Sequence, residues 1–156
     1  MEIQITWQHP TKKMDRARIR KRIGKILRDL GYPEAELSLL FTDDEGITEL
    51  NRRYLKRDKP TNVLAFPMTD AEQPELETSM LGDIVISLDA ALRDAQTSGE
   101  SLEGTVDRLL IHGLLHLLGY QHEGSRQEAR RMEKETERLL AMIASPGSGI
   151  SEVDNG

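Results

Sequence analysis

The chain has 156 residues, of which 37% are hydrophobic and 31% charged, a composition typical of a soluble globular protein of one domain. It contains no cysteine, which excludes disulfides and thiolate ligands, so any metal must be held by His, Asp or Glu. No segment approaches the ~18 apolar residues that span a membrane, and the N-terminus lacks the basic-then-apolar pattern of a secretory signal. We therefore expect a cytoplasmic protein without membrane association.

In the N-terminal half, the apolar residues switch between the periodicities of strands and helices. The first residues alternate between apolar and polar, which predicts a strand. A helical stripe follows, with Asp15 as its N-cap and Gly31 as its stop signal. The expected elements of this half are a strand at 3–7, a helix at 14–30, a strand at 37–41, a helix at 43–54 and a strand at 63–66.

The C-terminal half begins with a polar, acidic stretch at 69–78, which predicts a mobile loop. A strand is expected at 81–87, and its continuous Ile84-Val85-Ile86 run predicts burial on both faces. Residues 145–156 are rich in Gly and Ser and are expected to be a disordered tail. Three helices are expected between the strand and the tail, at 88–98, 102–118 and 125–144.

These elements predict a single α+β domain over residues 1–144, with a small mixed sheet of about four strands packed with about five helices. The helix at 102–118 is apolar nearly all round, which is typical of a central, buried helix. A metal site on this buried helix is suggested by the histidines that it carries.

Three of the four histidines lie in one short run, His112, His116 and His122, with the spacing H-x3-H-x5-H. The first two are four residues apart, so a helix presents them on one face. Gly119 lets the backbone leave the helix, and the turn can bring His122 back toward the other two. Three converging imidazoles are typical of a catalytic zinc site with an open fourth position.

The alternative is a purely structural role, because a histidine on a buried helix is commonly a hydrogen-bonded residue without a metal. Two histidines on one face, with a third after a glycine turn, favour the metal site. The spacing matches the zinc pattern H-E-x-x-H-x-x-G-x-x-H of metzincin peptidases, except that Gly113 stands where their general-base Glu would be. Because glycine cannot accept a proton, peptidase chemistry of that kind loses its base.

Other polar residues give weaker signals. His9 is isolated beside Pro10 and is expected at the surface. Asp83 lies within an apolar strand and could either orient a ligand histidine or cap a neighbouring turn. Glu123 could orient an imidazole or be a plain exposed acid.

Three motifs together resemble the YbeY family, bacterial single-strand-specific, metal-dependent endoribonucleases of rRNA maturation and ribosome quality control. They are Asp-Lys-Pro-Thr-Asn-Val-Leu-Ala-Phe-Pro at 58–67, Leu-Gly-Asp-Ile at 81–84 and the histidine run. The resemblance covers about residues 37–140. It implies a mixed α+β fold, one zinc ion (or another transition metal) on His112, His116 and His122, and a role at the 3′ end of 16S rRNA in the small ribosomal subunit.

The chain departs from the family pattern at two positions. Gln121 replaces an Asp before the last histidine of the run, and that Asp is not a ligand. Leu55 follows Tyr54 where the family often has an Arg facing the metal cleft, so another basic residue must contact the phosphate. Arg57 and Lys59 are the catalytic candidates, and Arg53 and Lys56 could also neutralise phosphates, although a charged, solvated helix end would look the same.

The leading hypothesis is therefore a metal-dependent endoribonuclease acting on single-stranded RNA, with rRNA and the small subunit as partners and no role for DNA. Because only 4% of the residues are aromatic, we expect recognition of the backbone rather than extensive base stacking. The alternatives are a zinc metallopeptidase-like hydrolase, which the ligand spacing favours and Gly113 disfavours, and a non-catalytic ribosome-associated zinc protein.

Overall fold

The computed structural model describes residues 1–10, 14–68, 80–120 and 125–144. Over this part of the chain it has four strands in one sheet and five helices, which confirms the predicted α+β architecture. The elements in chain order are β1 (Glu2–Trp7), α1 (Arg16–Asp29), β2 (Glu36–Thr42), α2 (Asp44–Leu55), β3 (Val63–Pro67), β4 (Met80–Ser87), α3 (Leu88–Ser98), α4 (Leu102–Leu117) and α5 (Arg126–Ala144).

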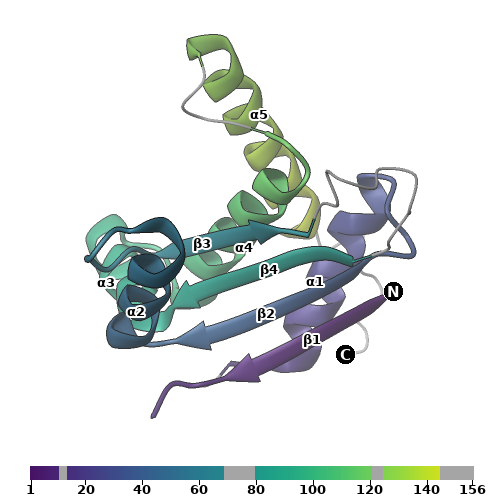
Figure 1. Ribbon diagram of the computed structural model, residues 1–156. Helices are drawn as coiled ribbons and strands as arrows, with labels where there is room; N and C mark the ends of the chain where they lie inside the picture. The colour runs from purple at the N-terminus through teal and green to yellow at the C-terminus, as the bar shows by residue number, and fades with distance from the viewer. Residues whose placement is uncertain (11–13, 69–79, 121–124, 145–156) are drawn as a thin grey trace.

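The sheet is mixed and its strand order is β1-β2-β4-β3. Strand β2 is parallel to both of its neighbours, β1 and β4, whereas the edge strand β3 runs antiparallel to β4. Helices α1 and α4 cover one face of the sheet and α2 covers part of the other (Figure 1). A large hydrophobic core lies between the sheet and helices α1 and α4. A small core, built on Ile47, Leu64 and Val85, lies between the sheet and α2.

The central strand β4 is buried from both sides, as its continuous apolar run predicts. Ile84 and Ile86 belong to the large core, and Val85 belongs to the small core beneath α2. Successive strand residues point to opposite faces, so the same alternation decides which polar residues of β4 can reach α4.

Helix α4 is the buried element that the sequence predicts. It packs against β3 and β4 on one side and against α3 and α5 on the other, and ten of its sixteen residues are buried. Ser101 caps its start by accepting a hydrogen bond from the Gly104 amide at 3.0 Å. Gly119, with φ of 100°, follows its last turn in the left-handed conformation.

Three helix starts, at Arg16, Asp44 and Arg126, differ slightly from expectation because a capping residue precedes each helix. Asp15 accepts hydrogen bonds from the Ala17 and Arg18 amides, so α1 begins at Arg16. The predictions for the loop at 69–78 and the tail at 145–156 lie outside the described residues. Within the part of the chain that is described, no helix is long and apolar enough to cross a membrane.

A buried carboxylate connects α4 to α1. The side chain of Asp107 is only 7% exposed, and its Oδ2 lies 3.2 Å from both Arg18 Nη2 and Arg22 Nη1. Burial raises the pKa of Asp107, and the two guanidinium groups oppose this effect without cancelling it. The folded protein therefore binds more protons than the unfolded chain at pH values between the two pKa values of this group. The contribution of Asp107 to stability thus falls as the pH rises through that window.

We expect Asp107→Asn to change the free energy of unfolding at pH 7 by no more than about 1 kcal/mol, because it relieves the burial of the charge while keeping an acceptor. Asp107→Ala should lose about 2–3 kcal/mol, because both arginines then lose their partner. Urea unfolding at pH 7 and pH 5 measures both effects. An Asn variant as unstable as the Ala variant would show that the ion pairs outweigh the desolvation of the carboxylate.

Candidate functional site

The first two histidines of the run lie side by side on α4. The ring centroids of His112 and His116 are 4.8 Å apart and their planes meet at 65°. Both side chains are half-buried, whereas their neighbours Ile111, Leu114 and Leu115 are fully buried. The two imidazoles therefore lie where the apolar helix reaches the surface, as their four-residue spacing predicts.

The histidines line a cleft of about 590 Å³ between α4, the end of α2, the following loop and β3. Arg57 and Lys59 of that loop line the same cleft, so the structure brings together four of the five predicted site residues. His122, the fifth, lies outside the described residues. The other described residues around the cleft are Asn51, Leu55, Pro60, Thr61, Asn62, Val63, Leu64, Ala65 and Gly113.

Asn51, which the sequence analysis did not select, holds the basic loop in place. Its backbone carbonyl accepts a hydrogen bond from the Arg57 amide at 3.2 Å, and its side-chain Nδ2 donates to the Lys59 carbonyl at 2.9 Å. Asn51 is only 2% exposed, and its Oδ1 is buried without a hydrogen-bond partner. A polar residue at an otherwise apolar position on the inner face of α2 is the only local signal that could have identified it.

The structure separates the four basic candidates into two pairs. Arg57 and Lys59 are exposed in the cleft and have no carboxylate partner among the described residues. Arg53 forms an ion pair with Glu49 at 3.2 Å, and Lys56 is the left-handed C-cap of α2 with φ of 59°. Neither lines the cleft, so the capacity to bind an anion beside the histidines rests with Arg57 and Lys59.

The donor set suits a transition metal. Neutral imidazole nitrogens are the commonest protein ligands for zinc and similar transition metals. The described part of the chain has no cluster of three or more His, Cys, Asp or Glu side chains that could hold an ion. A complete site therefore needs a ligand from outside the described residues, and His122 remains the predicted one.

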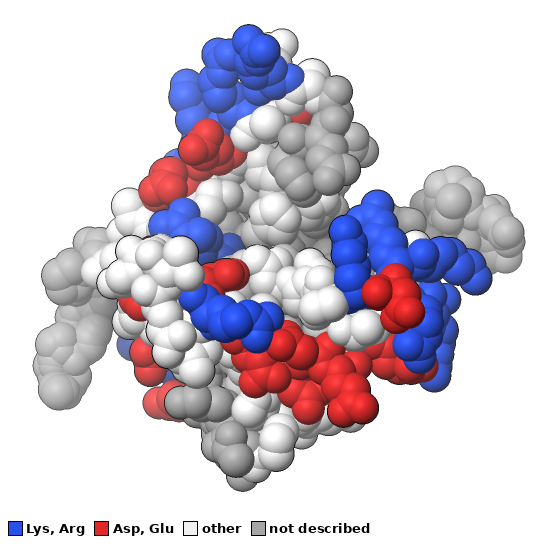
Figure 2. Space-filling model, turned by 90° about the vertical axis from the view of Figure 1, so that its left-hand side faces the viewer, with Lys and Arg blue, Asp and Glu red and all other residues white. Residues whose placement is uncertain are grey.

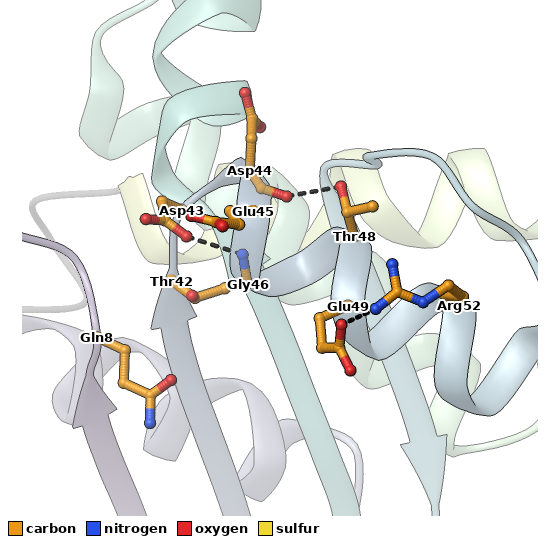
Figure 3. Close-up of a pocket in the computed structure, with 9 residues that line it drawn as sticks. All are labelled: Gln8, Thr42, Asp43, Asp44, Glu45, Gly46, Thr48, Glu49 and Arg52. Atoms are coloured by element: carbon orange, nitrogen blue, oxygen red, sulfur yellow. Dashed lines mark hydrogen bonds and ion pairs between the residues drawn. The ribbon is translucent and has the colours of Figure 1, made fainter.

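A second hollow lies at the N-terminus of α2 and is acidic rather than basic (Figure 3). Two of its carboxylates already have structural partners. Asp43 caps α2 by accepting from the Gly46 amide at 2.8 Å, and Asp44 pairs with Arg93 at 2.7 Å, which lowers the pKa of Asp44. A phosphate would be repelled here, whereas the described lining of the histidine cleft has no Asp or Glu.

Two weaker predictions are wrong. His9 is not a surface residue, because its side chain is only 6% exposed and its Nε2 lies 2.8 Å from Asp89 Oδ1. Within the described residues, Asp83 neither contacts His112 or His116 nor caps a turn. It pairs with Phe66 in the sheet register and shares with Ser38 and Thr6 a hollow on the sheet face opposite α4. The suggested role of Glu123 lies outside the described residues.

Comparison with known proteins gives a consistent result. A family model described as "Endoribonuclease YbeY" matches residues 4–144. Proteins named "Endoribonuclease YbeY" from Geobacter metallireducens and Syntrophus aciditrophicus are 42% and 44% identical to the chain, over 94% and 92% of its length and 99% and 90% of theirs. The solution structure of TM1509 from Thermotoga maritima superposes with a TM-score of 0.66 at 21% identity, covering 99% of this chain and 95% of that one.

Proposed function

The chain belongs to the YbeY family, and from this membership we propose that it is an endoribonuclease that cleaves single-stranded RNA in the cleft beside His112 and His116. One observation carries the proposal: the histidine pair lines a single cleft with Arg57 and Lys59, two cations that no carboxylate of the described residues pairs with. Similarity over nearly the whole chain to proteins named as endoribonucleases supports it.

The proposed metal ligands are His112, His116 and His122, with zinc as the expected ion. A zinc ion bound there would act as a Lewis acid on the phosphodiester and would lower the pKa of a water molecule to about 7. The chain's own residues bind and orient the RNA. Arg57 and Lys59 neutralise backbone phosphates, and Asn51 fixes the loop that carries both side chains, through its hydrogen bonds to Arg57 and Lys59.

The described cleft residues also limit which group can act as general base. The described lining of the histidine cleft contains no carboxylate, so no Glu or Asp of that lining serves as general base. Gly113 occupies the position where metzincin peptidases carry their Glu, which favours the nuclease over the peptidase.

We propose the small-subunit rRNA, near the 3′ end of 16S rRNA, as the cellular substrate, with roles in rRNA maturation and ribosome quality control in the cytoplasm. Cleavage of a single-stranded rRNA fragment that contains this end, compared with the same sequence as DNA and as a duplex, tests the proposal. We expect the single-stranded RNA alone to be cut, and chelator to abolish the cleavage. A protein that cuts none of the three in the presence of added zinc, nickel or manganese would contradict it.

The cleft cations give a sharper prediction. We expect Arg57→Ala with Lys59→Ala to raise the Kd for single-stranded RNA about tenfold at 150 mM salt. The slope of log K against log salt should flatten by about 1.4, since each phosphate contact contributes about 0.7. Arg53→Ala with Lys56→Ala removes the same charge from residues outside the cleft and is the matched control. Equal losses in the two double variants would mean that net charge, and not the cleft, governs binding.

A further inference from the structure

The first two turns of α5 have a composition that packing does not explain. None of the residues 126–131 is buried, whereas the buried residues of this helix all lie further along it, at Met132, Thr136, Leu139 and Ile143. In Figure 1 this end of α5 extends away from the sheet, and in Figure 2 basic side chains gather at the same height, at the top of the molecule. The segment therefore contributes little to the core.

Helix electrostatics do not explain the composition either. Arg126, Arg130 and Arg131 lie at the N-terminal end of α5, where the helix dipole favours acidic side chains and disfavours cations. Residues that break a local preference without a packing benefit mark functional positions more often than structural ones.

Two of these arginines have no carboxylate partner within the described part of the chain, although the protein has an excess of acids. Asp and Glu number 27 against 21 Lys and Arg, and several surface arginines elsewhere are paired, as Arg93 is with Asp44, Arg108 with Glu137 and Arg138 with Asp29. Among the described residues, Arg126 and Arg130 have no hydrogen bond or ion pair. We call these two residues the α5 arginine pair.

The helical spacing places the α5 arginine pair on the same stripe of the helix as Glu133. Arg126, Arg130 and Glu133 follow one another at intervals of four and three residues, so they form one stripe along α5. Glu133, together with Ala129, lines a groove between α4 and α5 that His112 also lines. Arg131 lies over the ring of Tyr120, 5.0 Å from its centroid, and so holds the start of α5 against the chain just beyond α4.

We propose that the α5 arginine pair binds backbone phosphates of the single-stranded RNA on the α5 side of His112, whereas Arg57 and Lys59 bind phosphates on the loop side. The RNA strand would then pass over the histidines and contact basic side chains on both sides of them. This inference rests on the proposed endoribonuclease function and adds to it a second part of the substrate-binding surface.

The test compares Arg126→Ala with Arg130→Ala against a charge-matched control, Lys21→Ala with Arg28→Ala. The control residues are exposed on α1 and have no ion-pair partner in the described part of the chain. A fluorescent 20-nucleotide single-stranded RNA is titrated in chelator, so that binding is measured without cleavage. We expect the Kd to rise about tenfold for the α5 double variant and the salt slope to flatten by about 1.4, with less than a twofold change in the control.

Cleavage kinetics separate this inference from the proposed function. With metal present, the α5 double variant should raise KM about tenfold and keep kcat within about twofold, and Lys at both positions should restore most of the affinity. If the wild type cleaves RNA and the α5 double variant has an unchanged KM and salt slope, the inference is overturned while the proposed function stands. Equal losses in the α1 control would also overturn it, whereas a wild type that neither binds nor cleaves RNA would remove the proposed function itself.

Discussion

Replacing His116 by alanine is expected to lower the rate of RNA cleavage by more than about 100-fold. Loss of a residue that only supports a metal ligand already costs about 10–100-fold, and a ligand itself should cost more. Because His116 is half-buried and faces the cleft rather than the core, the free energy of unfolding should change by only about 1 kcal/mol. Single-turnover cleavage of the rRNA fragment, with urea unfolding of the same preparation, measures both quantities.

Histidine 9 provides the matched control. His9→Ala removes the contact to Asp89 at 2.8 Å and should destabilise the fold by about 1.5–3 kcal/mol, yet the folded fraction should cleave at the wild-type rate. Elemental analysis of protein purified without an affinity tag should find about one metal ion per chain in the wild type and in His9→Ala, but little in His116→Ala. Equal cleavage by His116→Ala and wild type would point to a contaminating nuclease.

Local sequence signals predicted those features that neighbouring residues determine. The end of α4 follows from Gly119, and the proximity of His112 and His116 follows from their spacing on one helix. The two-sided burial of β4 follows from an uninterrupted apolar run. In each case the physical cause, a cap, a helical turn or a pleat, acts within a few residues.

Features that depend on distant contacts could not be predicted in this way. The partner of His9 is 80 residues away in sequence, and the polar neighbours of this histidine gave no sign of its burial. Asp83 could not be assigned to a sheet face until the register of β4 placed Ile84 against α4. Only the fold of the α2–β3 loop shows that Arg57 and Lys59 enter the cleft while Arg53 pairs with Glu49.

The glycine between the two histidines shows how packing limits chemistry. Gly113 is buried where α4 crosses β4, and a Cβ atom added to it would lie only 3.0–3.2 Å from three side-chain atoms of Ile84. Ile84 is itself fully buried in the large core. The position that holds a general-base Glu in metzincin peptidases is therefore occupied here by the residue that lets the helix approach the sheet.

Gly113→Glu is accordingly expected to destabilise the fold by more than about 4 kcal/mol and to give no peptidase activity, because its side chain must displace Ile84 and its charge must be desolvated. Gly113→Ala is the matched control. The gain in helix propensity, about 1 kcal/mol, offsets part of an overpacking cost of about 1–3 kcal/mol, so it should fold with a net loss near 1 kcal/mol and still cleave RNA. Urea unfolding measures the stability of both variants, and a casein hydrolysis assay measures their peptidase activity. The explanation would be wrong if the Glu variant were as stable as wild type and hydrolysed casein. In that case Gly113 would stand in place of a catalytic base, and close packing against Ile84 would not be the reason for glycine.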